Sequence, residues 1–107
     1  MADLLEKNQQ LIIYYDLYGP LLTEKQQQYF ELYYFDDLSL AEIATAEDVS
    51  RNAVFDALKK ATTLLYNYEE KLKLYERDQE VMKLLNELKK HTDPKGQKII
   101  EQLENEY

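Results

Sequence analysis

The sequence predicts an all-α protein, and three observations support that prediction. The chain has 107 residues but only two glycines and two prolines, so few positions interrupt a helix. Apolar residues make up 45% of the chain and recur at helical rather than alternating spacing. Serine or threonine precedes several of these segments, where a helix N-cap is expected. We therefore predict a helix-turn-helix bundle over residues 1–75, with its hairpin at residues 39–60, and an extended C-terminal helical segment over residues 76–107.

The first helix is expected to run from about Asp3 to Leu17. Asp3 and Glu6 can cap its start, and Gly19 with Pro20 should end it. Its predicted apolar side consists of Leu4, Leu5, Leu11, Ile12 and Tyr15.

A second helix is expected to begin at Thr23, because Thr23 and Gln26 have the spacing of a capping box. Asp36 and Asp37 should end it. Its apolar residues are mainly aromatic: Tyr29, Phe30, Leu32, Tyr33 and Tyr34. Aromatic side chains can stack on nucleic-acid bases. We favour a core between the first, second and fourth helices, where each tyrosine can bury its ring and keep its hydroxyl in water.

Residues 39–60 have the pattern of a helix-turn-helix. Ser39 and Glu42 can form a capping box, and Ser50 is a good N-cap for the following helix. Asp48 occupies the turn position where glycine is most frequent, because φ is positive there, and aspartate tolerates this at a cost of about 1 kcal/mol. The residues expected to face inward are Ile43, Ala44, Val49 (as the plug of the turn), Val54 and Leu58.

The opposite side of the second hairpin helix forms a polar and partly cationic surface, which we call the outer ridge. It consists of Arg51, Asn52, Phe55, Asp56, Lys59 and Lys60. A ridge of this kind is what a helix needs to enter the major groove of DNA. The alternative interpretation is an ordinary solvated helix face.

From Ser50 to Asp93 the chain contains neither glycine nor proline, which allows a helix of more than forty residues, about 60 Å long. We expect a break between Tyr66 and Gln79. Apolar residues at alternating steps of four and three predict a coiled-coil seam, and with it a homodimer. The seam consists of Val54, Leu58, Ala61, Leu65, Tyr68, Leu72 and Tyr75.

Two further helices are expected after the break. The first should end near His91, and its apolar set is Val81, Met82, Leu84, Leu85 and Leu88. The last should begin at Asp93 with Pro94 in its first turn. Its expected anchors are Ile99, Ile100 and Leu103.

The composition argues against catalysis and against a membrane span. The chain has no cysteine and a single histidine, His91, and its two glycines cannot build a phosphate-binding loop. We expect no enzymatic activity, no cofactor and no metal site. No apolar stretch approaches about 20 residues, and no secretory signal is present, so we expect a cytoplasmic protein. The net charge of −8 disfavours non-specific binding to nucleic acid.

Four segments together resemble the YlxM family, which are small helix-turn-helix proteins of Gram-positive bacteria. The segments are LLTEKQ (21–26), LYYFDDLSLAEIA (32–44), VSRNAVFDALKKA (49–61) and YEEKLKLYER (68–77). The resemblance runs from about residue 4 to residue 77. The hairpin is also similar to region four of bacterial sigma factors, which reads a promoter element. The family usually has glycine at position 48 and glutamine at position 52, where this chain has Asp48 and Asn52.

The resemblance implies a regulatory role in the signal recognition particle (SRP) pathway, because the family's gene lies beside that of the SRP protein Ffh or of its receptor. Two hypotheses follow. In the first, the outer ridge binds duplex DNA, with Arg51 on phosphate or guanine, Asn52 and Phe55 at base edges, and Lys59 and Lys60 on phosphates. In the second, favoured by the acidic charge, the chain is an accessory module for Ffh or the SRP RNA.

Overall fold

The computed structural model describes residues 7–106, and every regular element in that range is helical. The chain divides into two compact units, residues 1–72 (unit 1) and residues 73–107 (unit 2), which are described separately. Unit 1 contains α1 (Gln9–Tyr18), the 3₁₀-helix η1 (Gly19–Leu21), α2 (Glu24–Phe30), the π-helix η2 (Glu31–Phe35), α3 (Leu40–Glu47) and α4 (Arg51–Leu72). Unit 2 contains α5 (Leu74–Lys89) and α6 (Pro94–Glu104). The all-α prediction is confirmed.

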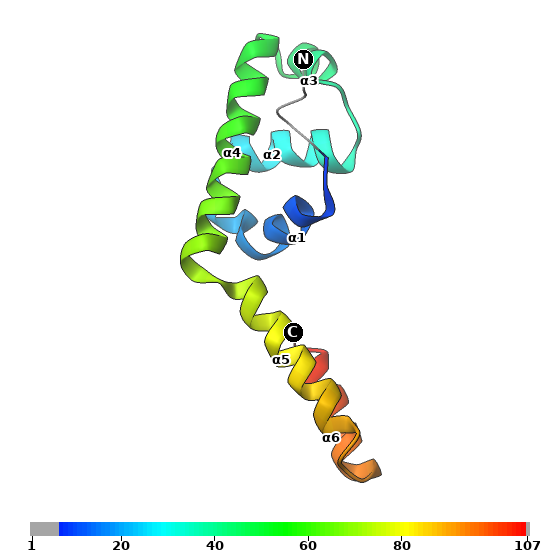
Figure 1. The fold of residues 1–107 in the computed structure, drawn as a ribbon. Coiled ribbons are helices and arrows are strands. Elements are labelled where there is room, and N and C mark those ends of the chain that lie inside the picture. The colour runs from blue at the N-terminus through cyan, green and yellow to red at the C-terminus, as the bar shows by residue number, and fades with distance from the viewer. Residues whose placement is uncertain (1–6, 107) are drawn as a thin grey trace. The chain divides into compact units, whose positions relative to one another are not determined.

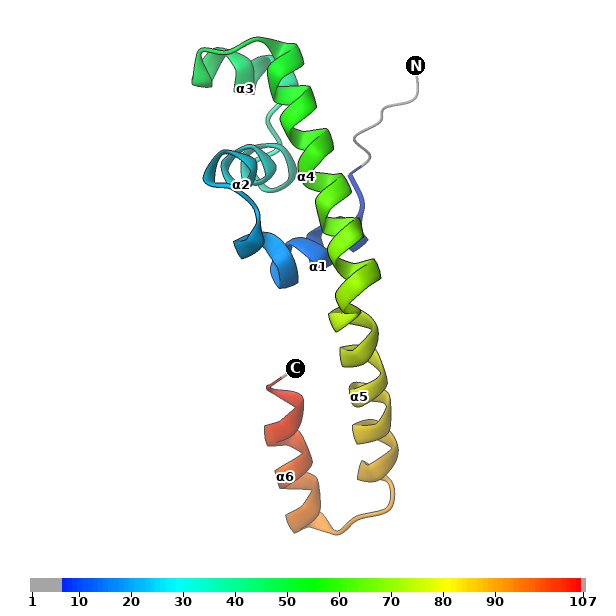
Figure 2. The same cartoon turned by 90° about the vertical axis from the view of Figure 1, so that its left-hand side faces the viewer.

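The long helix α4 is the spine of unit 1. Helices α1, α2 and α3 follow one another along the same side of it, with α3 beside its N-terminal end (Figure 1, Figure 2). α4 packs against all three. The largest side chains buried in this core are Tyr18, Phe30, Ile43, Val54, Leu58 and Leu65. Because α1, α2 and α3 rest on one side of α4, residues on its other side, such as Arg51, Lys59 and Lys60, are exposed.

Helix α1 begins later than the sequence suggested. Asn8 is its N-cap, and the side-chain oxygen of Asn8 accepts a hydrogen bond from the backbone N–H of Leu11 at 2.8 Å. The expected caps Asp3 and Glu6, and the expected apolar residues Leu4 and Leu5, lie outside the described residues.

The buried side of α1 also differs from the prediction, because Leu11, Tyr14 and Tyr18 are buried while Ile12 and Tyr15 are only partly covered. The tyrosines of α1 meet those of α4: the Tyr14 ring lies edge-on to Tyr66, with centroids 5.6 Å apart. The Tyr18 hydroxyl donates to Glu69 Oε1 at 2.5 Å. This polar contact at the tip of the ring lets Tyr18 face inward.

Helix α2 begins as predicted, with both hydrogen bonds of the Thr23–Gln26 capping box present. The aromatic residues form core rather than a stacking surface, because Tyr29, Phe30, Tyr33 and Tyr34 are all buried. The Phe30 ring is stacked between the rings of Tyr15 and Tyr34, at centroid distances of 4.2 and 4.3 Å.

The long helix breaks at Lys73, within the predicted interval, where the backbone has φ 55°. The coiled-coil interpretation is wrong over the first part of its seam. Val54, Leu58, Ala61 and Leu65 are each 0% exposed within unit 1. Spacing of four and three residues suits intramolecular packing on α1, α2 and α3 as well as it suits a second chain.

Unit 2 is an antiparallel helical hairpin (Figure 2). α6 begins as predicted, with Asp93 accepting a hydrogen bond from Gly96 N–H at 2.8 Å and Pro94 in the first turn. The buried apolar residues of the hairpin are Leu85 of α5 and Ile100 of α6. An ion pair also joins the two helices, with Lys89 Nζ 2.7 Å from Glu104 Oε1. The expected anchors Ile99 and Leu103 are 59% and 43% exposed, because a single partner helix covers only one stripe of α6.

No helix within residues 7–106 combines the length and the apolar character needed to cross a membrane.

Candidate nucleic-acid interface

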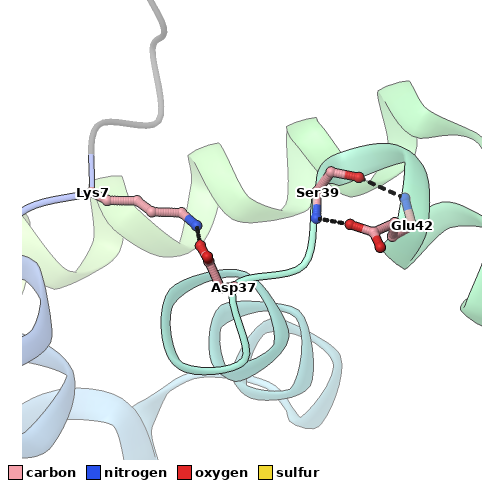
Figure 3. A network of polar contacts seen from close by, with 4 residues as sticks. All are labelled: Lys7, Asp37, Ser39 and Glu42. Carbon is pink, nitrogen blue, oxygen red and sulfur yellow. Dashed lines mark hydrogen bonds and ion pairs between the residues drawn. The ribbon is translucent and has the colours of Figure 1, made fainter.

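The first helix of the hairpin is fixed at its start by a capping box (Figure 3). The Ser39 hydroxyl accepts a hydrogen bond from Glu42 N–H at 3.0 Å, and Glu42 Oε1 accepts one from Ser39 N–H at 2.9 Å. The backbone hydrogen bond from Ser39 holds the pKa of the Glu42 carboxyl below its ordinary value of 4.5. Both predicted capping residues therefore have their predicted roles.

The turn between α3 and α4 has the geometry of a Schellman motif. Asp48 is left-handed, with φ 56° and ψ 48°. The N–H of Val49 donates to the Ala44 carbonyl at 3.0 Å, and the N–H of Asp48 donates to the Thr45 carbonyl at 3.4 Å. The positive φ expected at Asp48 is thus confirmed.

Val49 is not the plug of the turn. It is 36% exposed, because its position just after the left-handed residue uses its backbone to close the turn and leaves its side chain at the surface. Ile43 of α3 and Val54 of α4, each 0% exposed, fill the space between the helices instead. Ala44, the predicted small residue of α3, is buried at 7% exposure.

Helix α4 starts at its predicted N-cap, with the Ser50 hydroxyl accepting a hydrogen bond from Ala53 N–H at 3.0 Å. Val54 and Leu58 point into the core, as predicted. The two helices of the hairpin therefore pack through their inner residues and present the remaining side of α4 outward.

Five of the six residues of the outer ridge are exposed: Arg51, Asn52, Asp56, Lys59 and Lys60. The prediction that Phe55 is exposed needs correction, because Phe55 is partly buried. Position 55 lies about 100° around the helix from Val54 and about 60° from Leu58, so it borders the buried stripe. Arg51, Lys59 and Lys60 form no ion pair with another residue in the described range, which leaves their charges available.

A shallow hollow of about 430 Å³ lies between α2 and the C-terminal part of the outer ridge. We call it the α2–α4 hollow. It is lined by Gln26 of α2 and by Asp56, Lys59, Lys60, Thr63 and Leu64 of α4. Sequence reasoning missed Gln26, Thr63 and Leu64 because they lie outside the hairpin. Helical spacing alone places positions 56, 59, 60, 63 and 64 on one side of α4.

A second feature that the sequence did not reveal holds the loop before α3 (Figure 3). Lys7 Nζ lies 2.5 Å from Asp37 Oδ1 and 4.4 Å from the centroid of the Tyr33 ring. Asp37 has φ 58°, two residues before the N-cap Ser39. The hydrogen bond and charge of Lys7 keep the pKa of the Asp37 carboxyl below its ordinary value of 3.8.

Residues that bind metals do not gather in the described part of the chain. No group of three or more histidines, cysteines or carboxylates there could hold a metal ion. His91 has a 71% exposed side chain, and its Nε2 lies 3.6 Å from Glu87 Oε1.

Comparison with known proteins identifies the family. Residues 5–106 match the model of a family described as "Putative helix-turn-helix protein, YlxM / p13 like", so the similarity extends well beyond the region 4–77 inferred from motifs. A UPF0122 protein of Thermoanaerobacter sp. (strain X514) is 44% identical over 104 residues, covering 90% of this chain and 89% of the relative. One from Bacillus licheniformis is 45% identical over 102 residues, covering 94% and 95%. One from Bacillus cereus (strain AH187) is 42% identical over 107 residues, covering 94% and 97%. The chain therefore belongs to the YlxM / p13-like helix-turn-helix family, UPF0122.

Proposed function

We propose that this protein is a DNA-binding regulator that places the N-terminal half of α4 in the major groove. The observation that carries the proposal is the division of α4 into two sides. Val54 and Leu58 are fully buried against the other helices, while Arg51 and Asn52 are exposed at the helix start. Residues near the start of the second hairpin helix are the ones that reach base edges in helix-turn-helix complexes.

Each residue of the outer ridge has a distinct role in this proposal. Arg51 contacts phosphate or guanine, and the Asn52 amide can bond adenine through both its donor and its acceptor. Lys59 and Lys60 contact phosphates, and Asp56 partly neutralises them from one turn away. Phe55 contributes less contact surface than a fully exposed residue, because it is partly buried.

Three cations on the outer ridge predict weak binding by one copy, with a slope of log K against log[salt] of about −3. Unit 1 also carries thirteen acids against six bases, a net charge of −7, which opposes the approach of DNA outside the ridge. Two copies would double the favourable contacts, so we propose that the protein acts as a homodimer.

Unit 2 supplies a surface suited to a second copy. Leu84 and Leu88 of α5 are 69% and 50% exposed, and Ile99 and Leu103 of α6 are 59% and 43% exposed. On each helix these residues stand one before and three after the buried residue, Leu85 or Ile100. In an antiparallel hairpin these equal offsets put all four on one side.

Two further properties of unit 2 favour a second copy as the occupant of this apolar face. Units below about 40 residues usually need oligomerisation or a covalent or metal link to be stable. Residues 73–107 carry eight acids and seven bases, a net charge of −1, so two copies meet without strong repulsion.

We further propose that the regulation concerns the SRP pathway, as the family resemblance implies. The alternative is an accessory module that binds Ffh or the SRP RNA without contacting DNA. The net charge of −7 on unit 1 is the observation that favours this alternative, because an acidic surface suits a basic protein partner.

A titration of labelled duplex DNA by fluorescence anisotropy, beside a pull-down with purified Ffh and SRP RNA, separates the two functions. Under the DNA proposal, Arg51→Ala and Lys59→Ala each weaken duplex binding, while Lys95→Ala in unit 2 serves as the matched control and has little effect. If the duplex is bound equally by all four proteins, or by none, the DNA proposal fails. Capture of Ffh at micromolar concentration by every variant would then establish the alternative.

A further inference from the structure

The α2–α4 hollow is surrounded by hydrogen-bond donors that the fold does not use. Lys59, Lys60 and Thr63 have no hydrogen bond or ion pair from their side chains to another described residue. Gln26 accepts a hydrogen bond from Thr23 N–H through Oε1 at 2.9 Å as part of the capping box. That bond fixes the orientation of the amide, and its NH₂ group is engaged by no residue in the described range.

The lining of the hollow also includes apolar surface. Leu64 is partly buried and contributes an apolar surface, and the aliphatic stems of Lys59 and Lys60 extend that surface. Lysine, threonine and amide donors therefore line the hollow together with apolar surface. A sugar-phosphate unit of DNA has the matching chemistry, because its phosphate accepts hydrogen bonds and its deoxyribose ring is largely apolar.

We propose that the α2–α4 hollow seats a sugar-phosphate unit of the duplex backbone, so that the DNA contact extends from the hairpin onto α2. This inference rests on the DNA-binding function proposed above and adds Gln26 and Thr63 to the contact residues. The duplex backbone flanks the major groove, and the hollow adjoins the outer ridge through the three residues that they share, Asp56, Lys59 and Lys60. Contacts of this kind fix the position of the protein on DNA without reading sequence.

Asp56 provides a sharper test, because among the described residues that line the hollow it is the acidic one. Its carboxylate repels a phosphate seated beside it and weakens the field of the two lysines. Replacement of Asp56 by asparagine keeps the shape and removes the charge. A phosphate seat predicts tighter binding of this variant, whereas a helix face that does not meet DNA predicts no change.

The test uses the full chain and a labelled 20-base-pair duplex in anisotropy titrations at several salt concentrations. Gln26→Glu is the central variant, because glutamate also completes a capping box but replaces the amide donors by a carboxylate. Gln10→Glu, on the exposed first turn of α1, is the matched control for the change in net charge. Thr63→Val removes one donor at constant shape, and thermal unfolding monitored by circular dichroism checks that every variant folds.

We expect Gln26→Glu to weaken binding about tenfold and Gln10→Glu less than twofold, and Asp56→Asn to strengthen it several-fold. Lys60→Ala should lower the magnitude of the salt slope by about 1. If Gln26→Glu and Gln10→Glu have equal effects while Arg51→Ala abolishes binding, the proposed contact at the hollow is overturned and the DNA-binding function stands. If Arg51→Ala changes nothing either, both fail. Weakened binding of SRP RNA with unchanged binding of duplex DNA also overturns the proposal as stated.

Discussion

Unit 1 and unit 2 are both built from amphipathic helices, yet they differ in how completely they cover their own apolar side chains. In unit 1, Tyr18, Phe30, Ile43 and Leu58 are each 0% exposed, because three helices pack along one side of α4. In unit 2, Leu85 and Ile100 are the buried pair, and four apolar residues remain about half exposed or more. The comparison teaches that similar periodicity yields a closed core where several helices share it and an open face where only two do.

This difference also separates two kinds of surface. The exposed side of α4 in unit 1 carries charged and amide groups, which suit a polar ligand such as DNA. The exposed side of unit 2 is apolar and suits a surface like itself. Substitutions at matched positions can test whether unit 1 binds DNA and unit 2 mediates self-association.

The largest effect is expected from a cavity in unit 1. Leu58→Ala removes a fully buried side chain between α4 and its neighbours and should lower the free energy of unfolding by about 2–5 kcal/mol. Urea unfolding followed by circular dichroism measures it. Leu84→Ala in unit 2 is the control, since a 69% exposed leucine contributes little to the fold of one copy. Equal losses in both variants at low protein concentration would show that the comparison of the units is mistaken.

A second effect is expected on assembly. Leu88→Asp places a charge in the apolar face of unit 2 and should weaken self-association at least tenfold, about 1.4 kcal/mol. Sedimentation equilibrium at several concentrations gives the association constant. Leu21→Asp, at a 55% exposed leucine of unit 1, should leave that constant unchanged. A wild-type mass of 12.8 kDa at every concentration would exclude the dimer altogether.

A smaller effect is expected at the turn of the hairpin. Asp48 has φ 56°, a conformation that costs a non-glycine residue strain, so Asp48→Gly should raise the stability of unit 1 by about 1 kcal/mol. Thermal unfolding measures the gain. Ser39→Ala, which removes one bond of the capping box, should have the opposite sign and a cost of about 1 kcal/mol. Destabilisation by Asp48→Gly would mean that the aspartate makes a contact that outweighs its backbone strain.

The sequence was sufficient for elements whose signals are local. Capping spacings located the starts of α2, α3 and α6. The break that the length of the glycine- and proline-free interval required lies at Lys73, between Tyr66 and Gln79 as predicted. Features set by tertiary packing were missed. The seam at Val54, Leu58, Ala61 and Leu65 could not reveal whether its partner was the same chain or another, because the spacing is the same in both cases.

The candidate site was predictable to a similar extent. The pattern correctly separated the inner from the outer side of α4, but it placed Val49 of the turn inside and Phe55, at the edge of the buried stripe, outside. Positions at such edges depend on where the neighbouring helices end, which periodicity does not specify. Gln26 and Thr63 were missed because the approach of α2 to α4 brings together residues that are far apart in sequence.

The smallest effect, and one confined to acidic pH, is expected from the groups that fix the start of α3. The carboxyls of Asp37 and Glu42 have pKa values below their ordinary 3.8 and 4.5, through Lys7 and through the backbone N–H of Ser39 respectively. A carboxyl whose pKa is lower in the folded than in the unfolded state stabilises the fold fully above its unfolded pKa. That contribution is lost as the pH falls through the folded value. Unit 1 should therefore lose stability between about pH 5 and pH 3.

Glu42→Gln provides the decisive comparison, because glutamine can complete the capping box without titrating at acidic pH. Urea midpoints at pH 3, 4, 5 and 7 should show a shallower acid decline for this variant than for the wild type. Lys7→Met should remove the part of the acid decline that comes from protonation of the Asp37 carboxyl. Asp36→Asn serves as control, because Asp36 is one residue away and has no ion pair in the described range. Because these groups lie in unit 1, the decline should appear in signals from its tyrosine-rich core. An acid decline that Glu42→Gln and Lys7→Met leave unchanged would assign the pH dependence to other carboxyls and would leave the capping box with a purely geometric role.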